Sequence, residues 1–207
     1  MPFITFEGIE GCGKTTQLRR VAARLGAAAV LTREPGGTAI GQAVRQVLLD
    51  PASRALTPIA ELLLYFADRA QNVGEVVRPA LAAGRVVLCD RHVESSLAYQ
   101  GHGRGLDLGA IQGLAALATG GLRPDVIVLL DVPVEVGLAR VGRRGPHDRL
   151  EAEVREFHDR VRTGYKALAA GEPDRWLRVD GARAEDAVFD DLWSGLAARG
   201  VLGEAAR

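Results

Sequence analysis

The sequence reads Gly8-Ile9-Glu10-Gly11-Cys12-Gly13-Lys14-Thr15 near its N-terminus, and Thr16 follows. This is the pattern G-x-x-x-x-G-K-[ST], placed between an apolar run at 3–6 and a segment of helical pattern. Glycines in such a loop let backbone N–H groups turn inward around a phosphate, at the positive end of the following helix. The lysine reaches the terminal phosphates and the threonine hydroxyl binds Mg²⁺. Residues 8–16 therefore predict a nucleoside-triphosphate site in which Thr15 is a metal ligand.

Short apolar runs alternate with helical patterns along the whole chain. The runs lie at 3–6, 28–31, 85–89, 126–130 and 176–179. They lack the polar alternation of half-covered strands, which favours buried parallel strands. Thr57-Pro58 marks the start of one intervening helix, because threonine caps helices well and proline suits the first helical position. We therefore predict an α/β fold over 1–207 as a single domain, a five-stranded parallel sheet with helices on both faces.

Composition excludes several classes of protein. The 207 residues carry 26 Lys+Arg and 26 Asp+Glu, a formal net charge of +0, which argues against a non-specific nucleic-acid binder. No apolar stretch approaches the roughly 20 residues of a membrane span, and the N-terminus lacks a signal-peptide pattern. The two cysteines, Cys12 and Cys89, cannot form a disulfide framework. We expect a cytoplasmic enzyme without nucleic-acid or membrane partners.

Other phosphate-loop classes leave signatures that this sequence lacks. A GTPase needs N-K-x-D and D-x-x-G, but the only asparagine, Asn72, precedes Val73, and no aspartate stands three residues before a glycine. The transporter signature L-S-G-G-Q is also absent. A small-molecule kinase instead needs a second anion site and arginines that close over the transferring phosphate. Both features are present in the sequence.

The second anion site is predicted where the third run ends, at Asp90-Arg91. Ligands of parallel sheets bind at the carboxyl ends of the strands. Asp90 there is the expected carboxylate for Mg²⁺ or its waters, together with Thr15, and Arg91 is expected to contact an acceptor phosphate. The alternative is an ion pair of the two that caps the strand. Asp131 competes for the metal role, although its position before Val132-Pro133 is typical of a helix cap.

A short lid is predicted at about 140–150. Its arginines crowd a stretch broken by glycine and proline, and they are Arg140, Arg143, Arg144 and Arg149. Cations this close repel one another unless an anion arrives, so a mobile lid that brings them to a polyphosphate is one interpretation. A solvated basic loop is the other.

In order and spacing these motifs resemble the thymidylate kinases, and the resemblance covers nearly the whole chain. It rests on residues 8–15, 32–37, 65–71, 90–92, 95–101, 103–105 and 148–149. The resemblance implies a P-loop NTPase fold of the nucleoside monophosphate kinase type. It implies direct in-line transfer of the γ-phosphoryl of MgATP to dTMP, which yields dTDP for dTTP biosynthesis. It also implies a homodimer, for which the apolar stretch 55–77 offers either an interface or core.

The resemblance also assigns an acceptor site. Tyr65 and Arg69 are four residues apart on one helix face, where a ring and a guanidinium suit thymine. The family usually has phenylalanine at the first position, so whether Tyr65 or Phe66 stacks on the base stays open. Ser96 and Gln100 are further base contacts, because an amide both donates and accepts. The implied dTMP set is Glu10 near the 3′-hydroxyl, Arg33, Arg45 and Arg91 at the phosphate, and Tyr65, Phe66, Arg69, Ser95, Ser96, Tyr99 and Gln100.

Gly11 indicates the subgroup within this family. One subgroup carries a basic residue at this position, whereas the bacterial type takes its catalytic arginine from the lid. The implied catalytic residues are Lys14, Arg91, Arg144 and Arg149. The implied ATP-binding set is residues 8–16 with Arg143 and Arg144, and Arg143 is the alternative catalytic arginine.

Two rival functions remain at the level of sequence. One is a kinase for a different nucleoside monophosphate or for a deoxynucleoside. Arg45 and Arg91 favour a phosphorylated acceptor over a nucleoside, and a pyrimidine-like base is favoured by Tyr65, Arg69 and Gln100. The other is a nucleotide-binding regulatory protein that has lost transfer, which the intact Lys14, Thr15 and Asp90 disfavour.

Overall fold

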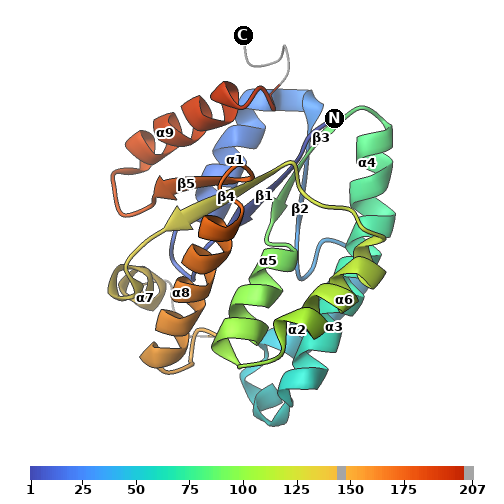
Figure 1. Cartoon of the computed structure of the whole chain (residues 1–207), viewed down its shortest axis with the longest axis vertical. Coiled ribbons are helices and arrows are strands. Elements are labelled where there is room, and N and C mark those ends of the chain that lie inside the picture. The colour runs from blue at the N-terminus through green and yellow to red at the C-terminus, as the bar shows by residue number, and fades with distance from the viewer. Residues whose placement is uncertain (144–147, 203–207) are drawn as a thin grey trace.

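The computed structural model describes residues 1–143 and 148–202, and its centre is one five-stranded parallel sheet (Figure 1). The strands are β1 (Phe3–Glu7), β2 (Ala29–Arg33), β3 (Val86–Asp90), β4 (Val126–Asp131) and β5 (Trp176–Asp180). They lie in the order β2-β3-β1-β4-β5, and every neighbouring pair is parallel. The predicted fold class is confirmed, and each predicted strand agrees with the observed one to within two residues at either end.

The helices between the strands follow the predicted alternation. They are α1 (Lys14–Leu25), α2 (Ala39–Leu49), α3 (Pro58–Asn72), α4 (Arg78–Ala82), α5 (Val93–Ser96), α6 (Leu108–Thr119), α7 (Val134–Gly142), α8 (Arg155–Gly171) and α9 (Glu185–Ala198). Short turns η1 (Gly26–Ala28) and η2 (Pro51–Ala55) and the wider helical segments η3 (Val73–Val77) and η4 (Leu97–Gly103) complete the order. Thr57 caps α3 as predicted, because its side chain accepts a hydrogen bond from the backbone N–H of Ala60.

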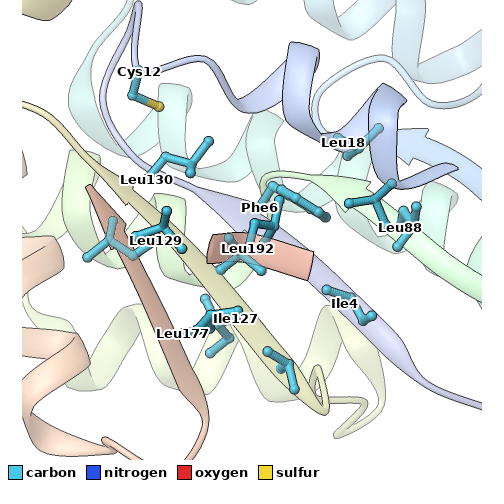
Figure 2. Packing of buried hydrophobic residues seen from close by; sticks show 14 of the residues in the cluster. Ile4, Phe6, Cys12, Leu18, Leu88, Ile127, Leu129, Leu130, Leu177 and Leu192 are labelled. Atoms are coloured by element: carbon cyan, nitrogen blue, oxygen red, sulfur yellow. The ribbon is translucent and has the colours of Figure 1, made fainter. Parts of the chain in front are cut away.

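Alternate side chains of the strands pack against helices on the two faces of the sheet. Phe6 and Leu88 point to one face, where they meet Leu18 of α1 and Leu192 of α9 (Figure 2). On the other face Phe3 packs with residues of β3, η3 and α4, and α5 and α8 lie on this side (Figure 1). Helices therefore cover both faces, as the lack of polar alternation in the strands predicted.

The topology brings the polar ends of separate strands to one edge. β1 lies between β3 and β4, so the loop after Glu7 is flanked by Asp90 on one side and Asp131 on the other. In register, Asp90 also faces Arg33 at the end of β2. Within the described residues, no helix combines the length and apolar character needed to cross a membrane.

Candidate active site

The loop between β1 and α1 is built to surround an anion. Gly8, Gly11 and Gly13 all have positive φ, and Gly13 precedes α1 without any side-chain cap. The first N–H groups of α1 therefore remain available for a ligand. Lys14 folds back over the loop, where its Nζ donates to the carbonyl oxygens of Gly8 at 2.8 Å and Ile9 at 3.0 Å.

Helix α7 packs closely against this loop at two glycines, Gly11 of the loop and Gly137 of the helix. A Cβ on Gly11 would lie 2.2 Å from the carbonyl oxygen of Gly137, and a Cβ on Gly137 would lie 2.5 Å from that of Glu10. Arg140 ties the contact further, because its Nη1 donates to the carbonyl oxygens of Gly181 at 2.9 Å and Gly11 at 3.3 Å. The base of the predicted lid is thus fixed against the phosphate loop.

A cavity of about 370 Å³ opens on the outer side of the loop. Its lining contains the predicted Gly11, Cys12, Gly13, Lys14, Thr15 and Thr16. It also contains residues that the predicted set lacks, namely Gln17, Arg140, Gly181, Arg183, Glu185 and Val188. Several of these follow β5, so the rule that ligands lie beyond strand ends was the available signal.

A second cavity, of about 210 Å³, lies between the loop, β2, β3 and α3. The predicted residues that line it are Glu10, Lys14, Thr15, Arg33, Arg45, Tyr65, Arg69, Asp90, Arg91, Ser95, Ser96, Tyr99 and Gln100. Lys14 and Thr15 line both cavities. The two spaces therefore meet at the lysine and threonine of the phosphate loop.

The two predicted metal ligands lie side by side at this junction. Thr15 Oγ1 donates to Asp90 Oδ2 at 2.7 Å. Within the described residues, no group of three or more acidic, histidine or cysteine side chains could hold a metal by itself. One carboxylate and one hydroxyl nevertheless fit Mg²⁺, which commonly takes few protein ligands and completes its shell with water and substrate phosphates.

Asp131, the competitor for the metal role, is engaged elsewhere. Its carboxylate accepts hydrogen bonds from Arg162 Nε at 2.8 Å and Arg178 Nη2 at 2.5 Å. It does not cap the next helix either, because α7 begins after Pro133 without a side-chain cap. The expectation of a helix cap was therefore wrong. The carboxylate of Asp131 instead pairs with one arginine of α8 and one of β5.

Arg91 lines the second cavity, which we call the acceptor cavity after the predicted role of its residues. Its backbone conformation is unfavourable. Its φ of 74° is in the left-handed region, which a side chain with a Cβ rarely adopts. The guanidinium donates to Tyr99 Oη, Glu10 Oε1 and Ser95 Oγ, each at 3.1 Å. These contacts fix the direction of the guanidinium within the cavity. The capping ion pair considered for Asp90 and Arg91 is not what forms, since Arg91 pairs with Glu10.

The two carboxylate oxygens of Glu10 differ, because one accepts hydrogen bonds and the other accepts none from the described residues. Oε1 accepts from Arg91 and, at 2.6 Å, from Tyr99 Oη. Oε2 has no hydrogen-bond partner among the described residues, although Nδ1 of the buried His158 lies 3.4 Å away. Burial opposes the charge, but His158, Arg91 and Lys14 lower the pKa of Glu10 to about 2. Glu10 is therefore an anion at neutral pH.

Beneath Arg91 lies a buried acid that sequence reasoning missed. Glu7, at the end of β1, accepts hydrogen bonds from Ser95 Oγ at 2.6 Å, the His92 backbone N–H at 2.7 Å and Tyr165 Oη at 2.8 Å. Burial and the nearby carboxylate of Glu94 raise the pKa of Glu7 to about 7. The available signal was an acidic residue in an otherwise apolar strand just before Gly8.

The wall of the acceptor cavity that is predicted to contact the nucleobase rests on Arg69, which is 1% exposed. Its Nε donates to Glu34 Oε2 at 2.7 Å, its Nη1 to Ser96 Oγ at 3.1 Å and its Nη2 to the His92 carbonyl at 2.8 Å. A guanidinium has more N–H groups than these three bonds use, so donors remain for a ligand. Burial opposes ionisation of Glu34, but His92 and Arg69 lower its pKa to about 2.

The structure separates the two aromatic candidates. Tyr65 lines the acceptor cavity. Phe66 is buried with Leu62 and Leu97, and the Arg69 guanidinium lies 4.6 Å from its ring centre. Phe66 is thus not part of the cavity wall, so the prediction that it contacts the base is corrected. Its ring instead supports the guanidinium of Arg69. Its place next to Tyr65 in the sequence puts it on another face of α3.

Arg149 also differs from its predicted setting. It is 8% exposed, and its Nη1 lies 2.6 Å from Glu61 Oε2 while its Nε donates to the Leu48 carbonyl at 2.8 Å. Glu61 also accepts from Gln100 Nε2 at 2.8 Å. In this conformation Arg149 lies outside the cavity lining and braces the wall that carries Gln100, rather than reaching toward phosphates. A buried acid on α3, far away in sequence, attracts it.

Two further arginines face the acceptor cavity without a carboxylate partner among the described residues. Arg45 Nη1 donates to the Pro35 carbonyl at 2.9 Å, and Arg33 Nε approaches that of Gly36 at 3.4 Å. Burial and the like charges of Arg33 and Arg91 lower the pKa of Arg45. Unneutralised cations around one cavity make an anion site.

The remaining lid predictions are only partly placed. Arg143 is exposed at the end of α7 and lines neither cavity. Arg144 lies outside the described residues, so its predicted catalytic and ATP-binding roles stay predictions.

Comparison with known proteins gives one family. The sequence profile described as "Thymidylate kinase" matches residues 6–192. A thymidylate kinase of Deinococcus radiodurans is 53% identical and aligns with 96% of this chain and 97% of its own. One of Synechococcus sp. (strain JA-2-3B'a(2-13)) is 54% identical, at 99% and 98%. A crystal structure of thymidylate kinase from Ehrlichia chaffeensis superposes with a TM-score of 0.77 and 32% identity, covering 94% of this chain and 98% of that one.

Proposed function

This chain belongs to the thymidylate kinase family, and from that premise we propose how its residues carry the reaction. It is an ATP:dTMP phosphotransferase, which forms the dTDP used in dTTP biosynthesis. One observation supports the assignment of residues: two cavities, one on each side of the phosphate loop, share Lys14 and Thr15. ATP fills the outer cavity, dTMP fills the inner one, and their reacting phosphates meet at the shared pair.

The transfer is direct and in line. The acceptor oxygen of dTMP is already anionic, so the site needs no strong general base. Its work is to hold two repelling anions together and to neutralise charge in the transition state. Lys14 holds the terminal phosphates of ATP and Arg91 holds the acceptor phosphate. Mg²⁺, when bound by Thr15 and Asp90 partly through water, supplies further neutralisation between the phosphates of ATP.

Arg33 and Arg45 hold the dTMP phosphate from the opposite side to Arg91. Support for this comes from their position on the cavity wall and from the absence of a carboxylate partner for either among the described residues. Their mutual repulsion is relieved when the doubly charged phosphate enters. Glu10, kept anionic by Arg91 and its neighbours, accepts a hydrogen bond from the deoxyribose 3′-hydroxyl.

The base is recognised between α3 and η4. Tyr65 contacts the face of thymine, while the unused N–H groups of Arg69 donate to a base carbonyl. Gln100 donates to Glu61 through Nε2, which leaves its amide oxygen to accept the N3–H of the base. A pyrimidine with a free N3–H satisfies this wall, whereas cytosine does not.

A coupled assay of ADP release tests the assignment, with dTMP, dUMP, dCMP, dGMP, AMP and thymidine as acceptors. We expect strong turnover with dTMP, weaker turnover with dUMP and negligible turnover with the others. Turnover led by another nucleotide would overturn the assigned base contacts but keep the transfer chemistry. Binding of both nucleotides without ADP release would overturn the transfer itself.

The catalytic arginine of the lid is assigned to Arg144. Gly11 leaves no cationic side chain at position 11 of the phosphate loop, and Arg149 is occupied by Glu61, which leaves Arg143 and Arg144 as candidates. We expect Arg144→Ala to lower kcat far more than it weakens dTMP binding, and Arg143→Ala to have the smaller effect. Normal kcat in Arg144→Ala would transfer the role to Arg143.

The working unit is a homodimer in the cytoplasm. Exposed apolar side chains lie on the mutually packed α2, α3 and α6, and they are Ile40, Val47, Ile59, Leu63, Leu108 and Leu117. Exposed apolar side chains on neighbouring helices are common at protein interfaces. Both cysteines are free and buried, as suits a reducing compartment. Sedimentation of the purified chain tests the dimer, and a monomer at micromolar concentration would refute it.

A further inference from the structure

A third cavity, of about 360 Å³, lies behind α5 as seen from the acceptor cavity. Its walls are mainly apolar, formed by Val93, Leu97, Ala115, Leu122, Ile127 and Trp176 among others. Its volume is within the roughly 300–1,000 Å³ typical of small-molecule sites. Among the described residues, none that lines it also lines either nucleotide cavity. The proposed reaction therefore leaves this space unused.

Glu94 is the buried charged group on the wall of this cavity. Its side chain is 8% exposed, and Oε2 is buried without a hydrogen-bond partner in the described part of the chain. A carboxylate removed from water without a partner is costly, so a bound group that supplied N–H donors and positive charge would be favoured. Glu94 thus offers an unfilled recognition point.

The other charged residues of the cavity are already paired. Arg123 Nη2 donates to Glu172 Oε2 at 2.8 Å at the mouth, and Arg175 Nη1 donates to the same oxygen at 2.5 Å. Glu94 is therefore the charged lining residue left without an ion pair among those the structure describes. We propose that this cavity is a second ligand site, which takes a small organic cation with a flat apolar body and directs its N–H groups to Glu94.

A ligand in this cavity changes the geometry of the acceptor site, because α5 contributes residues to both. Val93 and Glu94 line the cavity, whereas the next residues, Ser95 and Ser96, line the acceptor site. Ser95 Oγ accepts from Arg91 Nη1, and Ser96 Oγ accepts from Arg69 Nη1, both at 3.1 Å. A ligand that draws Glu94 toward itself shifts both serines, so the KM for dTMP changes with occupancy.

Benzamidine is the probe, because it joins a flat ring to an amidinium that can donate two parallel N–H bonds to a carboxylate. Calorimetric titration is made into the full-length protein with dTMP and ADP present, so that the nucleotide sites are filled. We expect saturable binding, and binding of the uncharged benzamide at least about tenfold weaker. No saturable binding, equal affinity for benzamide, or displacement of benzamidine by excess dTMP would each overturn the site.

Two variants locate the binding. Glu94→Gln removes the charge, and Ala116→Phe fills the exposed mouth of the cavity without touching a buried group. We expect at least about tenfold weaker benzamidine binding in both, and unchanged binding in Asp190→Asn, an exposed change on α9. Wild-type affinity in both cavity variants would overturn the site. An unchanged KM for dTMP at saturating benzamidine would overturn the coupling through α5.

Discussion

The two sides of the phosphate loop are built in opposite ways. On the acceptor side, two of the arginines are already paired with carboxylates: Arg69 with Glu34, and Arg91 with Glu10. On the donor side, the loop offers mainly backbone N–H groups and a lysine that folds onto the loop's own carbonyls. The acceptor wall is thus rigid before any ligand binds, whereas the donor loop is completed by the phosphates of ATP. Mutations should accordingly damage function alone on the donor side, and function together with stability where they break one of these ion pairs on the acceptor side.

The largest effect is expected at the donor loop. Lys14→Ala should lower kcat by about a thousandfold or more, because it removes the cation at the point where both phosphates meet. The free energy of unfolding should change by only about 1 kcal/mol, since the bonds lost are two to backbone carbonyls and a weak one to Cys12 Sγ. Lys166→Ala, at the other lysine, which is half-buried and lines neither nucleotide cavity, is the matched control. Near-normal turnover in Lys14→Ala would refute the role of the loop.

On the acceptor side, Arg69→Met should unfold the protein more readily. Glu34 would remain buried without its guanidinium, which costs about 3–5 kcal/mol of unfolding free energy. Denaturant titration measures this cost. Arg33→Met is the contrast, because Arg33 is exposed and lacks a buried carboxylate partner. It should weaken dTMP binding and leave stability nearly unchanged, and equal destabilisation of both variants would break the comparison.

A smaller effect is expected at His158, whose Nδ1 faces the open oxygen of Glu10 at 3.4 Å. His158→Leu should lower kcat/KM for dTMP about tenfold, because Glu10 loses a donor that helps to keep it ionised and in place. His158→Asn keeps an N–H near the same position and should restore most of the activity. If the two variants lose activity equally, His158 acts through packing alone.

The smallest effect is a pH dependence at Asp68, whose Oδ1 accepts from the Gly36 N–H at 2.8 Å. Burial raises its pKa in the folded protein to about 7, against an ordinary value of 3.8. The folded state therefore keeps a proton that the unfolded state loses, and stability falls as pH rises from about 4 to about 7. Asp68→Asn should gain stability relative to wild type across that window and level off above it. Unfolding curves at several pH values measure this, and a constant difference would refute it.

The parts that the sequence predicted are those set by short stretches. The phosphate loop, the five strands and the start of α3 each depend on residues within about ten positions of one another. Many residues that line the inner cavity were also predicted, since the resemblance supplied motifs such as 32–37 and 95–101. Their role in binding the acceptor stays a prediction.

The parts that were missed depend on partners far apart in the chain. Glu7 meets Tyr165 across 158 positions, and Glu61 attracts Arg149 from the base of the lid. Phe66 and Tyr65 differ only in which face of α3 they occupy, which packing against Leu97 decides. No local pattern encodes these pairs, because each residue alone resembles an ordinary core or surface position.

The contact between Gly11 and Gly137 has a consequence for how the family can vary. Any side chain at position 11 would have to displace the backbone of α7, since its Cβ would lie 2.2 Å from the Gly137 carbonyl oxygen. A cationic side chain at position 11 and this packing of α7 therefore exclude each other.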